Sequence, residues 1–90
     1  MPERTVTVAS SVGLHARPAT IFVQAAAKQP VKVTIAKPGR PPVDARSVLS
    51  VLGLDVRGGQ QVILAAEGDG ADAALDNLSA LLSRDLDKEH

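Results

Sequence analysis

The chain has 90 residues, no net charge at neutral pH and no cysteine, so it allows one compact domain and excludes disulfide and thiol chemistry. Hydrophobic residues make up 44 % of it, but Phe22 is the only aromatic one, so valine, leucine, isoleucine and alanine must build the core. The chain lacks an apolar run of roughly 18 residues and begins with a strand-like segment, so we expect no membrane insertion and a cytoplasmic location.

The charges are unevenly spread along the chain. Residues 1–57 hold eight Lys and Arg against three acidic residues, which gives +5, whereas residues 58–90 hold two against seven, which gives −5. This pattern fits ordinary surface solubility, and it equally fits a basic face that meets acidic partners. Nucleic-acid binding is disfavoured, because the chain has neither net positive charge nor stacking aromatics.

The first half of the chain predicts a strand, a helix and a second strand. Residues 5–8 alternate with period two, as in a half-buried strand. Residues 16–28 predict a helix that Pro30 stops, and its buried stripe comprises Ala19, Phe22, Val23 and Ala26. Residues 31–35 alternate again, which places on the core face Val31, Val33 and Ile35.

The second half predicts a turn, an edge strand, a short helix, a central strand and a last helix. Residues 37–42 are rich in Pro and Gly, so 43–45 would return as an antiparallel edge strand. Ser47 is a good N-cap for a helix over 48–53. The most apolar strand, 60–66, should be central; the last helix spans 71–83, and 85–90 should fray. The order β-α-β-β-α-β-α favours one α+β domain with helices on one face of an antiparallel or mixed sheet.

Seven residues stand out for their chemistry: Gly13-Leu14-His15-Ala16-Arg17-Pro18-Ala19. His15 is the only histidine besides His90, and it directly precedes the first predicted helix. The first-turn N–H groups, such as those of Ala16 and Arg17, together with the positive end of the helix dipole, form an anion-binding corner. Arg17 adds a fixed positive charge. Both features favour a neutral, nucleophilic His15 and would stabilise a phosphoryl group attached to it.

Plainer interpretations remain open for this stretch, since a histidine at a helix start is commonly a cap or a surface residue. A metal enzyme is disfavoured, because the second histidine lies in the expected frayed tail. A hydrolase is also disfavoured, because no aspartate lies near the motif in sequence.

The seven-residue motif resembles the active-site signature of the HPr family, the histidine-containing phosphocarriers of the bacterial phosphoenolpyruvate:sugar phosphotransferase system. The likeness runs from about Thr5 to Leu82, and residues 45–54 resemble the family's regulatory-serine segment. It implies an open-faced β-sandwich, in which a four-stranded antiparallel sheet carries three helices on one face. It also implies a cytoplasmic monomer without cofactor or metal, which is a carrier rather than an enzyme and turns over only with partner enzymes.

The resemblance further implies roles for individual residues. His15 would accept a phosphoryl group on Nδ1 from enzyme I charged by phosphoenolpyruvate, and would donate it to enzyme IIA domains of sugar permeases. Arg17 would neutralise the phosphate. Ser47 would be a substrate of a serine kinase and phosphatase, a role compatible with capping. Partner docking would involve the short-helix residues Arg46, Val48, Leu49 and Leu52.

Three residues depart from the family's common pattern: Val12 stands at an often polar position, Ser50 at a common glycine and Arg46 at a frequent lysine. None of them alters His15 or Arg17. The alternative function is a regulatory interaction module that acts through the Ser47 helix.

Overall fold

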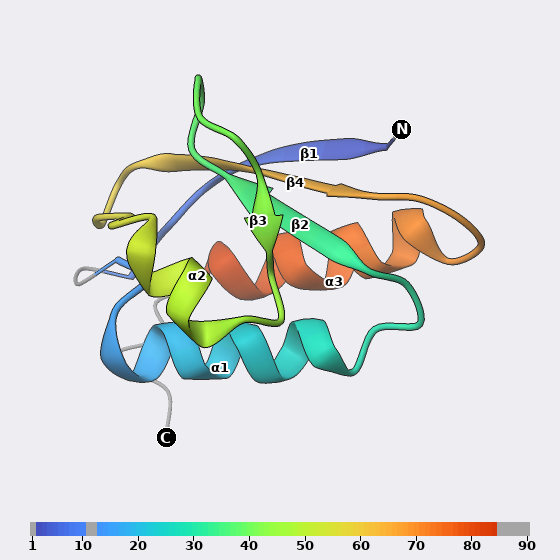
Figure 1. Ribbon diagram of the computed structural model, residues 1–90, viewed down its shortest axis with the longest axis horizontal. Coiled ribbons are helices and arrows are strands. Elements are labelled where there is room, and N and C mark those ends of the chain that lie inside the picture. The colour runs from blue at the N-terminus through green and yellow to red at the C-terminus, as the bar shows by residue number, and fades with distance from the viewer. Residues whose placement is uncertain (1, 11–12, 85–90) are drawn as a thin grey trace.

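The computed structural model describes residues 2–10 and 13–84, so the expected frayed tail 85–90 and Val12 lie outside the described residues. In these ranges four strands and three helices follow one another in the order β-α-β-β-α-β-α (Figure 1). They are β1 (Glu3–Thr7), α1 (Ala16–Ala27), β2 (Val33–Ala36), β3 (Val43–Asp44), α2 (Val48–Gly53), β4 (Gln61–Ala66) and α3 (Ala71–Leu82). The order is the one that the sequence predicts. Within these ranges no helix has the length and apolar character that crossing a membrane requires.

The strands form one antiparallel sheet in the order β1-β4-β2-β3. Val6 pairs with Val62 and Ile35 with Leu64, so inward-facing residues of neighbouring strands stand opposite one another. The most apolar strand, β4, is indeed central, and β3 lies at the edge, where the prolines that precede it disturb no ladder.

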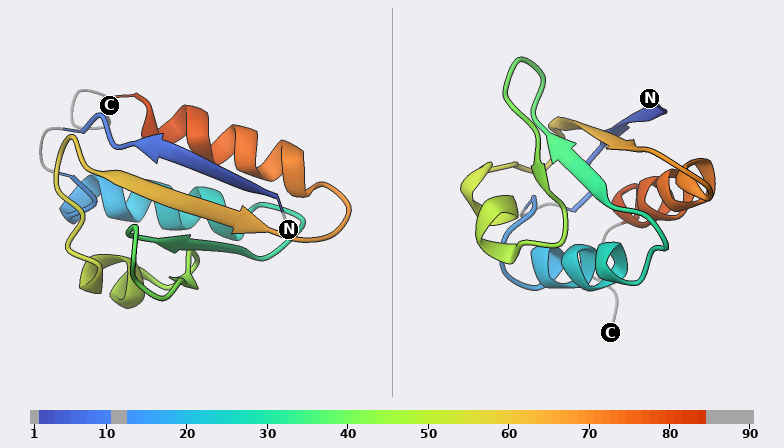
Figure 2. Two further views of the ribbon diagram at one scale, coloured as in Figure 1. Left: turned by 90° about the horizontal axis from the view of Figure 1, so that it is seen from above. Right: turned by 45° about the vertical axis from the view of Figure 1, so that its right-hand side comes forward.

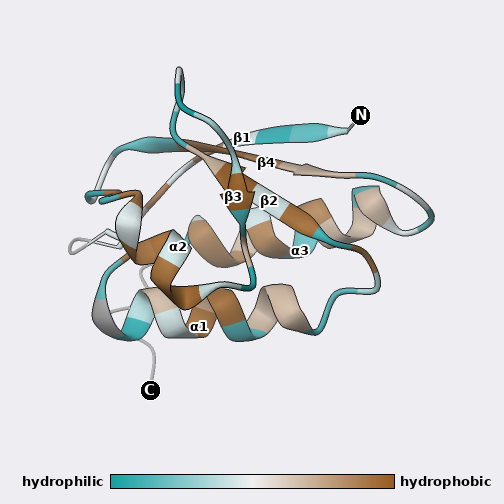
Figure 3. Ribbon diagram, in the orientation of Figure 1, coloured by the Kyte–Doolittle hydropathy of each residue, from teal (hydrophilic) through white to brown (hydrophobic). Residues whose placement is uncertain are grey.

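The three helices cover one face of this sheet (Figure 2). Hydrophobic residues recur along α1 and α3 and dominate α2 (Figure 3). Phe22 of α1 is fully buried with Leu75 and Leu78 of α3 in a core otherwise aliphatic. The other face of the sheet carries Thr5, Thr7 and Gln61, which are exposed. The fold is therefore α+β, an open-faced β-sandwich with a four-stranded antiparallel sheet and three helices.

Boundaries differ from the sequence expectations by one to two residues. β1 begins at Glu3, because its first residues already pair with the end of β4. β2 begins at Val33, and Val31 is only half-buried because residues 28–31 still belong to the turn after α1. Ala45 leaves the edge strand but is fully buried. None of these shifts changes which face of an element meets the core.

Candidate functional site

His15 is the N-cap residue of α1. Its backbone is extended, with φ −128° and ψ 159°, and its side chain makes no capping hydrogen bond. The imidazole is therefore not used to cap the helix, so of the two plainer interpretations of the sequence only that of a surface histidine remains. The N–H groups of the first turn, those of Ala16 and Arg17 among them, have no carbonyl partner within the helix and lie beside His15. Its side chain is 40 % exposed, so the site lies on an open surface.

Gly13 brings this corner against the segment that follows α2. Its φ is +71°, and a Cβ there would lie 2.0 Å from the carbonyl oxygen of Val56. The next residue, Leu14, is fully buried and donates its N–H to that same oxygen over 2.9 Å. Glycine is needed at this position for the positive φ and for the close backbone approach.

The same approach places a carboxylate next to the histidine. Nε2 of His15 lies 3.2 Å from Oδ1 of Asp55. Asp55 is 40 residues away in sequence and was not among the site residues predicted from the sequence. One signal was available: an aspartate just after a short helix tolerates the left-handed conformation, and Asp55 has φ +53°. Nothing in the sequence indicated that it would face His15.

A second residue missed by the sequence analysis is Arg57. Its guanidinium lies 3.4 Å from Oδ2 of Asp55, and its backbone N–H donates to Oε1 of Gln60. The positive charge of Arg57 and its hydrogen bond lower the pKa of Asp55, and Lys37 and His15 add smaller effects in the same direction. The carboxylate beside His15 is thus ionised at neutral pH.

Arg17 is the second residue of α1 and is exposed. Its guanidinium forms no hydrogen bond or ion pair with any other residue in the described part of the chain. It is therefore available for an anion bound near the helix start.

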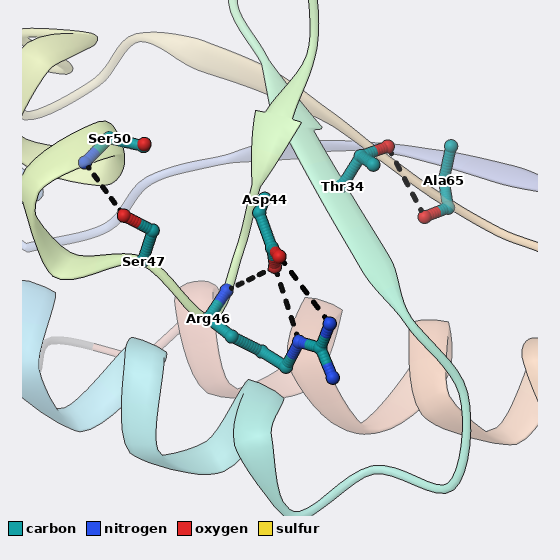
Figure 4. A network of polar contacts seen from close by, with 6 residues as sticks. All are labelled: Thr34, Asp44, Arg46, Ser47, Ser50 and Ala65. Carbon is teal, nitrogen blue, oxygen red and sulfur yellow. Dashed lines mark hydrogen bonds and ion pairs between the residues drawn. The ribbon is translucent and has the colours of Figure 1, made fainter.

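The short helix α2 packs against α1 and presents both polar and apolar groups. The Ser47 hydroxyl caps it by accepting the Ser50 N–H over 3.3 Å, as Figure 4 shows. The predicted docking residues differ in exposure: Leu49 is 80 % exposed and Val48 40 %, whereas Leu52 is half-buried.

Arg46 precedes α2 and is held by Asp44 of β3. Its guanidinium reaches both carboxylate oxygens, at 3.3 and 3.4 Å, and its backbone N–H donates to Oδ1 (Figure 4). These contacts with Arg46, the backbone one foremost, lower the pKa of Asp44. The pair fixes a positive group next to the exposed apolar residues of α2.

In the described ranges no three His, Cys, Asp or Glu residues gather closely enough to hold a metal ion. The site consists of a histidine, a carboxylate, guanidinium groups and backbone N–H groups. This set can hold and pass on an anionic group.

Comparisons with known proteins agree with this chemistry. The family model described as "PTS HPr component phosphorylation site" matches residues 2–84. The phosphocarrier protein HPr of Streptomyces coelicolor is 50 % identical over 88 residues, which cover 98 % of this chain and 95 % of that protein. A crystal structure of HPr from Thermoanaerobacter tengcongensis superposes with a TM-score of 0.90 at 36 % identity, over all of both chains. The crystal structure of Crh, a Bacillus subtilis catabolite-repression protein described as a domain-swapped dimer, has a TM-score of 0.72 at 35 % identity, over 94 % and 97 % of the chains. The chain belongs to the HPr family of phosphocarrier proteins of the phosphotransferase system.

Proposed function

We propose that His15 carries the phosphoryl group: it accepts the group on Nδ1 from enzyme I charged by phosphoenolpyruvate, and donates it to enzyme IIA domains of sugar permeases. The observation that carries this proposal is the position of His15, exposed at the start of α1 with its side chain free of any capping role. A nucleophilic histidine splits one difficult transfer into two easier ones.

The surroundings of His15 suit a phosphorylated ring. The backbone N–H groups of Ala16 and Arg17 and the positive end of the dipole of α1 attract phosphoryl oxygens. The guanidinium of Arg17, which pairs with no other residue in the described ranges, would add charge-assisted hydrogen bonds to those oxygens. We assign Arg17 the role of stabilising the phosphoryl group while it waits for the next acceptor.

Partners would dock over the surface formed by Arg46, Val48, Leu49 and Leu52. Leu49 offers a large exposed apolar side chain, and the Asp44–Arg46 pair adds charge at the rim. An apolar centre with a charged rim is typical of protein interfaces. This surface and the open His15 corner fit large protein partners better than a small substrate. The chain would therefore turn over only together with its partner enzymes. We also expect it to need no cofactor and to act in the cytoplasm.

The alternative function is regulatory. The relative Crh of Bacillus subtilis is described as a catabolite-repression protein and as a domain-swapped dimer. Ser47 would then be modified by a serine kinase and phosphatase, and regulatory proteins would read the α2 surface. A phosphate on Ser47 would sit at the start of α2, where the backbone N–H groups favour negative charge. We expect a monomer, which size-exclusion chromatography with light scattering would test.

The direct test mixes the protein with enzyme I and phosphoenolpyruvate and measures its intact mass and the acid lability of the adduct. One acid-labile phosphoryl group on the wild type and none on His15→Ala would support the proposal. An unmodified wild type, or an unchanged adduct on His15→Ala, would refute it. Phosphorylation by a serine kinase that His15→Ala leaves unchanged and Ser47→Ala abolishes would support the regulatory function.

A further inference from the structure

We propose that Asp55 is a positioning residue for His15: its carboxylate holds the proton on Nε2, so that Nδ1 keeps the free lone pair that attacks phosphorus. This inference rests on the proposed function of His15 and goes beyond it, since it names a residue that neither the motif nor the short-helix segment contains.

Oδ1 of Asp55 lies 3.2 Å from Nε2, the ring nitrogen that is not expected to carry the phosphoryl group. A neutral imidazole has one protonated nitrogen and one with a lone pair, and its surroundings decide which is which. A negative carboxylate this close to Nε2 favours, through its charge, the form in which that nitrogen carries the proton. The other nitrogen, Nδ1, is then the nucleophile.

Asp55, with φ +53°, is the only non-glycine residue with positive φ among residues 2–10 and 13–84. Glycine adopts this conformation with the least strain, although aspartate tolerates it better than most residues. Glycine would adopt this backbone conformation more easily than aspartate. The presence of an aspartate here therefore indicates that its side chain has a function. Here the side chain contacts His15 and Arg57.

Arg57 and His15 each contact a different oxygen of the Asp55 carboxylate. Arg57 contacts Oδ2 over 3.4 Å and leaves Oδ1 to His15. The guanidinium keeps Asp55 ionised and neutralises it at longer range, so that a phosphoryl group arriving at the ring meets less repulsion. Arg57 thus holds the carboxylate of Asp55, and this carboxylate in turn orients the imidazole of His15.

The transfer step balances with this arrangement. The Nδ1 lone pair forms the N–P bond, while the bond from phosphorus to the donor breaks and its electron pair leaves with the donor. No proton leaves the ring, so the imidazole gains a positive charge shared with the Nε2–H. The carboxylate of Asp55, 3.2 Å from Nε2, stabilises this developing positive charge electrostatically.

The test compares the full-length wild type with Asp55→Asn and Asp55→Gly. Asparagine keeps an oxygen acceptor and tolerates the positive φ, whereas glycine removes the side chain and relaxes the backbone. Asp76→Asn is the matched control, because Asp76 is also an exposed aspartate paired with an arginine, Arg4, but lies on α3. Thermal unfolding of every variant checks that the fold is kept.

Two readouts are measured. The ¹⁵N spectrum of the His15 ring at about pH 8, where an ordinary imidazole is neutral, reports the tautomer without any phosphoryl donor. The rate of phosphoryl acceptance from enzyme I reports the chemistry. We expect the proton on Nε2 in the wild type and the control, and a population protonated on Nδ1 in Asp55→Gly. The acceptance rate should fall roughly three- to tenfold in Asp55→Gly and less in Asp55→Asn, a modest effect because both groups are exposed.

The same tautomer and rates within twofold in all four proteins would overturn the inference. A shift of tautomer in Asp55→Gly together with an unphosphorylated wild type would instead refute the proposed function and leave the Asp55–His15 relationship standing. The two failures are therefore distinguishable.

Discussion

The N–H of Leu14 donates to the carbonyl oxygen of Val56 over 2.9 Å, and this one bond joins the His15 corner to the segment after α2. Leu14 stands between two residues that also approach this segment. The backbone of Gly13 passes against Val56 and Arg57, and the ring of His15 lies close to Asp55. The site therefore depends on two chain segments about 40 residues apart being held in backbone contact.

Gly13→Ala should break this contact. The added Cβ would lie 2.0 Å from the Val56 oxygen, so the two segments must separate. Gly39→Ala is the matched control, because Gly39 also has positive φ but its Cβ would meet nothing within 4 Å. We expect Gly13→Ala to lose about 1–3 kcal/mol more unfolding free energy than the control. Equal denaturation midpoints for the two variants would contradict this.

Arg17→Ala should affect transfer and not folding. The side chain is exposed and unpaired within the described ranges, so the denaturation midpoint should stay within error. Loss of a charged partner for the phosphoryl oxygens should slow acceptance roughly ten- to a hundredfold. Arg40→Ala, an exposed arginine in the turn before β3, serves as control. A large loss of stability with normal transfer would show that the assignment is mistaken.

Phe22→Ala should act through the core alone. Phe22 is fully buried and is the only aromatic side chain, so no neighbouring ring can fill the space. The variant should lose about 3–5 kcal/mol of unfolding free energy. Urea denaturation followed by circular dichroism measures this, and an unmoved midpoint would be incompatible with the packing described.

Ser47 substitutions separate capping from regulation. Ser47→Ala removes the acceptor for the Ser50 N–H and should cost about 1 kcal/mol. Ser47→Asp keeps a capping oxygen and adds negative charge, so its stability should stay near that of the wild type while partner binding changes. If both variants unfold at the wild-type midpoint, the hydroxyl is not needed as a cap.

Asp44 makes stability depend on acid pH. Its pKa is lower in the folded chain, through Arg46, than the ordinary value of about 3.9 expected when unfolded. Its stabilising contribution is therefore complete above that value and is lost as the pH falls through the folded pKa. Asp44→Asn keeps an acceptor for the Arg46 N–H but cannot ionise. In this variant the free energy of unfolding should therefore fall less steeply at acid pH than in the wild type. Asp69→Asn is the control, because Asp69 forms no ion pair with the described residues, and its unfolding free energy should fall at acid pH as steeply as that of the wild type. An equal loss of steepness in both variants would argue against Arg46 as the cause.

The sequence predicted the fold because its signals are local. Alternation around Val6 and Val62 identifies strands, and the spacing of Ala19, Phe22 and Ala26 identifies a buried helix face. The same holds for His15 and Arg17, which share one short motif. Their assigned roles are still to be tested by experiment.

Asp55 and Arg57 were not predicted, because they come to the site through a contact between segments that are far apart in sequence. Only the close passage of Gly13 by Val56 brings the carboxylate to the imidazole, and no periodicity encodes that passage. Likewise, the alternating pattern predicted that the second strand begins at Val31, but in the structure Val31 still belongs to the turn after α1. Long-range backbone contacts are the part that single-sequence patterns leave undetermined.

The most direct test of the central claim follows one phosphoryl group through the protein. The chain is phosphorylated by enzyme I, separated from it and mixed with an enzyme IIA domain, and both proteins are weighed by intact mass spectrometry over time. We predict that the phosphoryl mass disappears from the wild-type chain as it appears on the IIA domain, and that His15→Ala never acquires it. A phosphorylated chain that transfers nothing, or a His15→Ala chain that transfers as well as the wild type, would contradict the account.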